Sequence, residues 1–447
     1  MKRTGHASVT ASRPDRVRGE TGPLPLSVNT SVDENHLMER VVDHRNIMRA
    51  FSRVKQNGGS PGIDGMTVEE LPGLLIHHWS VIRESLLKGS YTPQPVKRVE
   101  IPKPGGGCRL LGIPTVVDRL IQQALLQVLQ PEWDNTFSDS SYGFRPGRSA
   151  HDAVSLAQSY LHKGYAWVVD IDLEKFFDRV NHDKCMSLVS RRIKDGRVIT
   201  LIRRYLTSGV LIGEDYHETH EGTPQGGPLS PLLANLLLDE LDKELERRGH
   251  YFVRYADDCN IYVRSARSGR RVMASVTGYL RRKLKLAVNE AKSAVDRPWK
   301  RTFLGFTFTK RRPNRRKTSE KALQRFKEEV RRMTQRTRGV TLKQVLHDLK
   351  SYLVGWKLYF GFSEAKSVFQ GLDSWLRRRL RCYLWKQWGR AGYRRLVERG
   401  VTRDLAWYTA KSAHGPWRLS RSPALSFALP KKYFLRMGLP LLYERSG

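Results

Sequence analysis

In the first two thirds of the chain, apolar residues recur at helical spacing in some segments and at strand spacing in others. They recur at helical spacing over residues 37–54, 116–130 and, as a leucine-rich run, 232–245. Alternating apolar and polar positions over 96–114 predict a hairpin with a glycine-rich tip, and the apolar run at 166–172 predicts a buried strand. This succession of helices and strands predicts an α+β fold.

Local turn and capping signals divide these blocks into elements. The loop 56–65 is rich in glycine, and a capping-box pattern that begins at Thr67 predicts a helix start there. Pro131 is expected to end its helix, and a further helix is expected from near Ser149. After about residue 315 the strand signals give way to basic helical patterns.

The net charge of the chain indicates which class of partner it binds. The 447 residues include 79 Lys and Arg against 44 Asp and Glu, a net charge of +35. Such an excess predicts a polyanionic partner, and nucleic acid fits better than an anionic membrane surface. No apolar run is long enough to span a bilayer, and no signal-peptide pattern is present. The four cysteines form no C-x-x-C pair, which disfavours a zinc ribbon and favours a reducing, cytoplasmic compartment.

Two adjacent carboxylates, Asp257 and Asp258, lie in a turn between two β-rich runs, 251–255 and 259–263. Crowding two carboxylates is unfavourable unless a cation neutralises them, and oxygen ligands beside substrate phosphates suit Mg²⁺. The tetrapeptide 255–258 therefore predicts a divalent-metal site. The alternative at this point is an ordinary hairpin, because Asp is a common turn residue.

A second pair of acids, Asp170 and Asp172, shares one face of the strand predicted at 166–172. If this strand lies beside the hairpin, one of its acids converges with the two turn acids. Such a set holds two divalent ions about 3.5–4 Å apart, an arrangement for nucleotidyl transfer. Either strand acid could instead cap a helix that begins near Glu174.

The chain resembles reverse transcriptases in three segments, which follow the order of their A, B and C motifs. These segments are VVDIDLEKFFD (168–178), GTPQGGPLSPLLAN (222–235) and YADD (255–258). Other segments resemble the bacterial group II intron-encoded reverse transcriptase/maturases: 101–105, 112–114 and 142–149 their fingers, 56–65 their N-terminal extension and 303–306 their primer grip. The resemblance spans about residues 37–395 and rests on several long motifs in order.

This resemblance implies a right-hand polymerase fold, with fingers and a palm built on an antiparallel sheet, followed by an α-helical thumb or maturase X domain. Composition adds a basic N-terminal tail without periodicity, which is expected to be disordered. The expected divisions are 1–35 (tail), 36–165 (N-terminal extension and fingers), 166–312 (palm), 313–395 (thumb and maturase X domain) and 396–447 (C-terminal basic segment).

The resemblance also assigns roles to the acids and the neighbouring aromatic pair. Asp172, Asp257 and Asp258 are the implied catalytic and metal-binding triad, with two Mg²⁺ ions. Asp172 is preferred to Asp170 because it precedes Phe177 by the family's spacing. Phe177 is the implied steric gate that rejects a ribose 2′-hydroxyl. Phe176 is the alternative gate, and core packing is the other role for either ring.

Basic and polar residues complete the contacts that the resemblance implies. Lys103 and Arg109 are expected to bind the incoming triphosphate. Gln225 is expected to contact nucleotide and template. Lys292 is expected near the leaving pyrophosphate, with a solvated surface lysine as the alternative. Nucleic acid is expected at Arg145, Arg148, Arg377, Arg378, Arg379 and Arg381; the alternative for the last four is the solvated face of a helical bundle.

These features imply an RNA-directed DNA polymerase that binds group II intron RNA, assists its splicing and copies it into DNA during retrohoming. The expected partners are intron RNA, an RNA template with a DNA primer, dNTPs and target DNA, in a bacterial cytoplasm. The lack of cysteine pairs and the short C-terminal part resemble the class without an endonuclease domain. Two alternatives stay open: a free-standing reverse transcriptase of retron-like, defence-linked or domesticated type, and a splicing cofactor that no longer polymerises.

Overall fold

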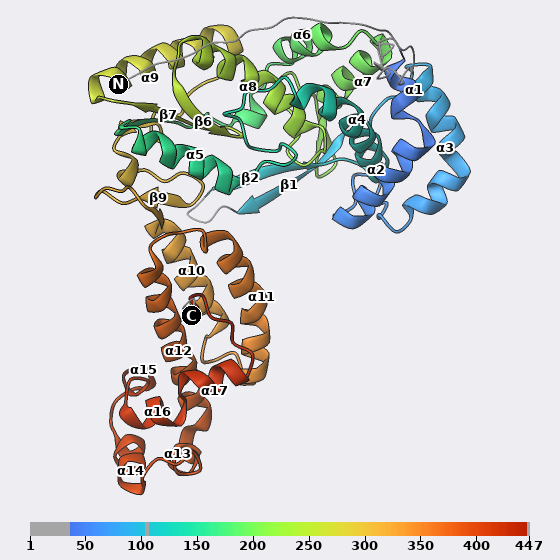
Figure 1. Cartoon of the computed structure of the whole chain (residues 1–447). Coiled ribbons are helices and arrows are strands. Elements are labelled where there is room, and N and C mark those ends of the chain that lie inside the picture. Colours follow the sequence, from blue (N-terminus) through green and yellow to red (C-terminus); the bar gives the residue numbers. More distant parts are fainter. Residues whose placement is uncertain (1–35, 103–106, 445–447) are drawn as a thin grey trace, which may run out of the picture.

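The computed structural model describes residues 36–102 and 107–444, which form two lobes (Figure 1). The larger lobe combines helices and sheets, and the smaller lobe, formed by the last eight helices of the described part, is joined to it through a short two-stranded sheet. The predicted α+β composition is confirmed. The N-terminal tail and Lys103 lie outside the described residues.

A four-stranded antiparallel sheet forms the centre of the larger lobe, with the strand order β6-β7-β3-β8. Its strands are β6 (Tyr251–Tyr255), β7 (Asp258–Val263), β3 (Trp167–Ile171) and β8 (Ala294–Asp296). The predicted strand at 166–172 and the acid-bearing hairpin are therefore neighbours. The short strand β8 carried no clear signal in the sequence.

Alternate residues of β3 pack into two different cores, as the period of a strand requires. Val169 and Ile171 face the main core, to which α8 (Ser230–Arg247) and α9 (Ala266–Tyr279) contribute. Val168 faces a second cluster with α5 (Ala150–His162). Helices thus cover both faces of the central sheet, which explains why its strands are apolar on both sides.

The two strands of the predicted hairpin are confirmed as β1 (Val96–Pro102) and β2 (Cys108–Ile113), whereas residues 103–106 of its predicted tip lie outside the described residues. It continues into β4 (Val210–Ile212) and β5 (Asp215–His217), so that a second sheet has the order β2-β1-β4-β5. β1 and β2 project from the larger lobe toward the smaller one (Figure 1).

Helices at the N-terminal side differ from the predicted boundaries at three places. The helix expected over 37–54 is divided in two, because the Asp43 carboxylate accepts hydrogen bonds from Arg45 and Asn46 N–H groups and caps a new helix. Thr67 does bond Glu70, but the helix starts at Leu71. Pro131 does not end its helix. It lies near the C-terminal end, where one missing N–H is tolerated and buried Trp133 anchors the last turn.

The remaining helices of the larger lobe are α1 (Leu37–Val41), α2 (His44–Asn57), α3 (Leu71–Leu87), α4 (Val116–Asp134), α6 (His182–Arg192) and α7 (Gly196–Leu206). A π-helical turn, Leu280–Leu284, follows α9. Ser149 caps α5 in a capping box with Asp152, as its position predicted. Within the described ranges, no helix is both long and apolar enough to cross a membrane.

The smaller lobe is entirely helical and follows β9 (Phe306–Phe308) and β10 (Arg316–Thr318). Residues on both sides of position 395, such as Leu376 and Leu425, share one hydrophobic core. The described C-terminal residues therefore belong to this lobe and form no separate unit. Its helices are α10 (Glu320–Met333), α11 (Leu342–Phe360), α12 (Lys366–Trp388), α13 (Gly392–Val397), α14 (Arg403–Lys411), α15 (Pro416–Leu419), α16 (Pro423–Ala428) and α17 (Lys431–Arg436).

Candidate active site

The acids of the two predicted motifs meet at one end of the central sheet. In the antiparallel β3–β7 ladder Ile171 pairs with Cys259, so the next position sets Asp172 opposite Asp258. Asp257 lies beside them in the turn between β6 and β7. The backbone of Asp172 is fixed by Ser293, whose Oγ accepts a hydrogen bond from its N–H at 3.0 Å.

The electrostatics of this cluster favour a cation. Asp258 reaches solvent, but the protein around it removes part of its hydration, and this desolvation raises its pKa to about 7. The charges of Asp257, Asp170 and Asp172 add to the increase, whereas Lys292 opposes it. Desolvation also raises the pKa of Asp257. A divalent cation stabilises the charged form of carboxylates whose pKa is raised in the metal-free protein.

Asp170 and Asp172 differ in their partners. Asp170 Oδ2 accepts a hydrogen bond from Arg301 Nε at 2.8 Å and is neutralised by that guanidinium. Among the described residues, the ion-pair partner of Asp172 is the exposed Lys292 ammonium, 3.7 Å from its Oδ1. Arg301 therefore satisfies Asp170 within the protein, whereas Asp172 keeps its oxygens available at the sheet end.

The oxygen donors of Asp172, Asp257 and Asp258 fit a hard divalent cation such as Mg²⁺. The site is not assembled in advance, however. Among residues 36–102 and 107–444, no three Asp, Glu, His or Cys side chains gather closely enough to share one ion. The backbone nevertheless places the acids at the same end of the sheet.

The two adjacent phenylalanines after β3 have different surroundings. Phe176 is buried in the main core, whereas Phe177 is half-buried and packs against that core from outside. Phe177 lines a hollow of about 70 Å³. This hollow lies between the β1–β2 hairpin and the loop before α8, and its other lining residues include Leu110, Leu111, Thr223 and Gln225.

The glycine-proline loop before α8 is bonded to both walls of this hollow. Thr223 N–H donates to the Phe177 carbonyl at 2.7 Å, and the Gln225 carbonyl accepts from Gly112 N–H at 2.8 Å. The Gln225 side chain donates to Asp178 Oδ1 at 3.3 Å. Arg109 is exposed on β2, and its charge lowers the pKa of Asp257, which places it within electrostatic reach of the acids.

The structure does not support nucleic-acid contact by Arg145. Its side chain is 3% exposed and its Nε donates to Asp134 Oδ1 at 2.8 Å. Its other donors bond backbone carbonyls, including that of Ser138. Arg145 thus holds the 138–148 loop together. Arg148 is partly exposed, pairs with Asp139 and lies over the Tyr142 ring.

Most arginines of the α12 cluster have partners within the protein, and their contact with nucleic acid stays a prediction. Arg378 stacks on the Trp417 ring at 3.6 Å, Arg379 donates to Thr334, and Arg381 donates to the Leu429 carbonyl. Arg377 bonds the exposed Ser374 on its own helix. All four residues are half-buried. The C-terminal segment contacts Arg378 and Arg381, whereas Arg379 bonds the end of α10.

One residue at the site was missed by sequence analysis. Arg254 is fully buried on β6, immediately before the YADD segment, and is paired with buried Asp242 of α8. A charged residue within the apolar run 251–255 was the available signal, since charges are rarely buried without a partner.

Two family models match the chain. Residues 101–308 match the reverse transcriptase (RNA-dependent DNA polymerase) family, and residues 323–400 match the group II intron, maturase-specific domain. These matches confirm the expected polymerase domain and the helical maturase domain after it. The first begins at the last two residues of β1 and runs through β9, including the acids, and the second runs from within α10 through α13.

Curated relatives agree with these matches. Protein YkfC of Escherichia coli (strain K12) is 40% identical over 193 residues, which cover 42% of this chain and 51% of the relative. Group II intron-encoded protein LtrA of Lactococcus lactis subsp. cremoris is 40% identical over 195 residues, which cover 43% of this chain and 32% of the relative. The aligned part thus spans about half of the first relative and about a third of the second.

Among solved structures, a partial Cas6-RT-Cas1–Cas2 complex is 27% identical, with a TM-score of 0.36, over 55% of this chain and 43% of that chain. The paired strands that carry the acids and the family matches define a reverse transcriptase domain joined to a maturase domain. In these two segments the chain is similar to group II intron-encoded reverse transcriptase/maturases.

Proposed function

We propose that this protein is an RNA-directed DNA polymerase that extends a DNA primer on an RNA template and also serves as a maturase for a group II intron. The observation that carries the polymerase activity is the position of Asp172 opposite Asp258, within the segment that matches reverse transcriptases. A strand acid and a turn acid on neighbouring strands provide the oxygen ligands that two-metal nucleotidyl transfer requires.

Asp172, Asp257 and Asp258 would hold two Mg²⁺ ions. When bound, these ions activate the primer 3′-hydroxyl and neutralise charge on the triphosphate. Arg109 and Lys292 add positive charge near the acids. Lys103 is assigned to the triphosphate with Arg109, because both belong to the segment that forms the β1–β2 hairpin and its connection.

Nucleotide selection is assigned to the hollow beside the acids. The half-buried Phe177 ring rejects a ribose 2′-hydroxyl sterically, without offering it a hydrogen bond. Gln225 lines the same hollow, and its loop is fixed to β2 and to the Phe177 backbone. We therefore assign to Gln225 the contact with nucleotide and template.

The maturase activity rests on the match of residues 323–400 and on the charge of +35. Binding intron RNA, a template–primer duplex and a DNA target all require neutralisation of phosphates. We place these functions in a bacterial cytoplasm. The polymerase activity is tested by primer extension on an RNA template with dNTPs and Mg²⁺, and the maturase activity by splicing of the intron that surrounds or accompanies the coding frame.

A further inference from the structure

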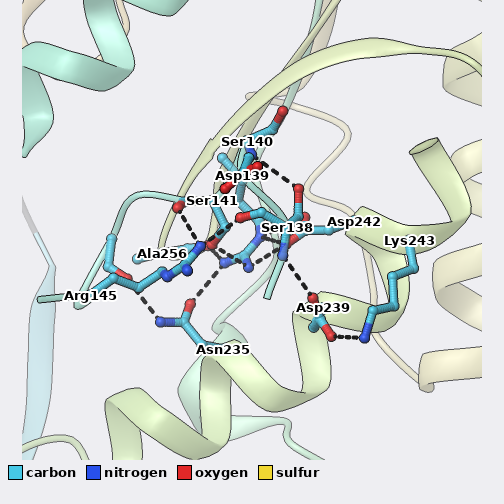
Figure 2. A network of polar contacts seen from close by, with 12 residues as sticks. Ser138, Asp139, Ser140, Ser141, Arg145, Asn235, Asp239, Asp242, Lys243 and Ala256 are labelled. Carbon is cyan, nitrogen blue, oxygen red and sulfur yellow. Dashed lines mark hydrogen bonds and ion pairs between the residues drawn. The ribbon is translucent and has the colours of Figure 1, made fainter. Parts of the chain in front are cut away.

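A fully buried ion pair lies directly behind the turn that carries Asp257 and Asp258. Arg254 and Asp242 are both 0% exposed in their side chains. Arg254 Nε donates to Asp242 Oδ1 at 2.8 Å and to Oδ2 at 3.0 Å. Figure 2 shows Asp242 and Asn235 of α8 converging with Ser141 and Ala256 around this point.

The remaining donors of Arg254 connect three parts of the chain. Nη1 donates to Asn235 Oδ1 at 3.0 Å and to the Ala256 carbonyl at 2.9 Å. Nη2 donates to Ser141 Oγ at 2.8 Å and to Asp242. All five guanidinium N–H groups are therefore used, which satisfies a buried charge fully. One of the bonds ends on the backbone of the acid-bearing turn itself.

The backbone at Ala256 is in a conformation that an alanine rarely adopts. Its φ is +55°, in the left-handed region, and surrounding structure has to maintain it. Gly143 packs against the turn from the other side, because a Cβ at that position would lie 2.2 Å from Ala256 N. The Gly143 carbonyl accepts from Asn235 Nδ2 at 2.8 Å, so the same network holds both sides of Ala256.

We propose that Arg254 is the positioning residue of the metal-binding turn. Its bond to the Ala256 carbonyl holds the left-handed backbone that presents Asp257 and Asp258 toward Asp172. Arg254 touches none of the reacting groups and acts only through the turn. This inference rests on the proposed polymerase function, and it assigns to the arginine before YADD a task beyond the stability of a buried ion pair.

Arg254→Lys separates positioning from charge. Lysine keeps a positive charge opposite Asp242, but its single nitrogen cannot reach Asp242, Asn235, Ser141 and Ala256 together. The matched control is Arg197→Lys on α7. It weakens another arginine–aspartate pair, with Arg197 Nη2 2.8 Å from Asp195 Oδ2 and Asp195 1% exposed, in a part of the fold away from the turn.

The primary measurement is Mn²⁺ binding to the full-length protein, followed by electron paramagnetic resonance without any substrate. We expect Arg254→Lys to weaken Mn²⁺ binding by about tenfold or more, as loss of a group that orients metal ligands does. Hydrogen exchange should increase in the metal-free peptide 251–263. The Mg²⁺ concentration for half-maximal extension should rise, while the KM for primer–template stays unchanged. Arg197→Lys should lower the melting temperature without these effects.

If Arg254→Lys does not fold, Gly143→Ala provides an independent test. It leaves the ion pair intact but pushes a methyl group against Ala256 N, so it should produce the same loss of Mn²⁺ affinity. Unchanged Mn²⁺ affinity and unchanged exchange in a folded variant would overturn the positioning role. A wild-type protein that extends no primer would instead refute the proposed function, whatever the Mn²⁺ titrations give.

Discussion

Lys292 holds its ammonium nitrogen 3.7 Å from Oδ1 of Asp172, at the end of the sheet where the three acids meet. This pairing gives the exposed lysine a place beside the triad, and its charge lowers the pKa of Asp258. A cation at this position can stabilise the negative charge of the leaving pyrophosphate. The role of Lys292 near the leaving pyrophosphate stays a prediction, with a solvated surface lysine as the alternative.

We expect Lys292→Ala to lower kcat/KM for dNTP incorporation by about tenfold, because one charge-assisted contact to the leaving group is lost. Single-turnover extension over a range of dNTP concentrations measures this effect. Lys300→Ala is the matched control, since Lys300 is equally exposed and lies 3.7 Å from Asp296, away from the turn. Equal rates for both variants would remove Lys292 from the site.

The turn acids also predict how the metal-free protein responds to pH. The pKa of Asp258 is raised from 3.8 to about 7 in the folded state, so folding favours its protonated form. This contribution to stability is complete below about pH 4 and is lost as the pH rises through about 7. In EDTA, the urea midpoint should therefore fall between pH 5 and pH 8, and by less in Asp258→Asn.

Metal binding should have the opposite pH dependence to the stability of the metal-free protein, because a protonated carboxylate is not a ligand. Mn²⁺ affinity should rise with pH through about 7, and Mg²⁺ should restore the urea midpoint at pH 8. If Asp258→Asn shows the same pH slope as the wild type, a different group is responsible for it.

The two adjacent phenylalanines should separate selectivity from stability. Phe177→Ala opens the hollow beside the acids and should raise ribonucleotide incorporation, measured as the ratio of kcat/KM for rNTP and dNTP. Phe176→Ala should leave this ratio unchanged but destabilise the protein by about 3–5 kcal/mol, because Phe176 is 2% exposed in the main core. The reverse pattern would assign the gate to Phe176.

Arg145 and Arg148 should also respond differently to substitution. Arg145→Ala leaves Asp134 without its buried partner and should destabilise the protein by about 3–5 kcal/mol in urea unfolding. The folded variant should retain its RNA affinity. Arg148→Ala removes a partly exposed pair, for which a loss of less than about 1 kcal/mol is expected. A loss of RNA affinity in folded Arg145→Ala would restore its predicted contact role.

The sequence was most informative where short-range patterns determine the structure. The alternation around Asp170 and Asp172 predicted a strand, and the turn at 255–258 predicted its neighbour, so the meeting of the acids followed from strand pairing. The cap at Ser149 depends on residues three positions apart and was also predictable. Phe177 and Gln225 came from the family resemblance, and their roles stay predictions.

Contacts between distant residues could not be predicted in the same way. Arg254 bonds Ser141, which lies 113 positions earlier, and no local pattern records that partner. Arg378, Arg379 and Arg381 of α12 have partners 39 to 48 positions away in the chain, whereas Arg377 bonds Ser374 on its own helix. The density of these arginines predicted a nucleic-acid surface, and the distant partners of three of them could not be read from the sequence. Pro131 stays in its helix because tertiary packing outweighs the local signal.

The proposed polymerase activity is tested by primer extension on an RNA template with dNTPs and Mg²⁺, in which Asp257→Asn is compared with the wild type. We expect the wild type to extend the primer and Asp257→Asn to lose activity by at least about 100-fold, more than the loss of an orienting partner causes. Both proteins should bind the template–primer equally well. A wild type that binds this duplex tightly but extends nothing, or full activity in Asp257→Asn, would contradict the account.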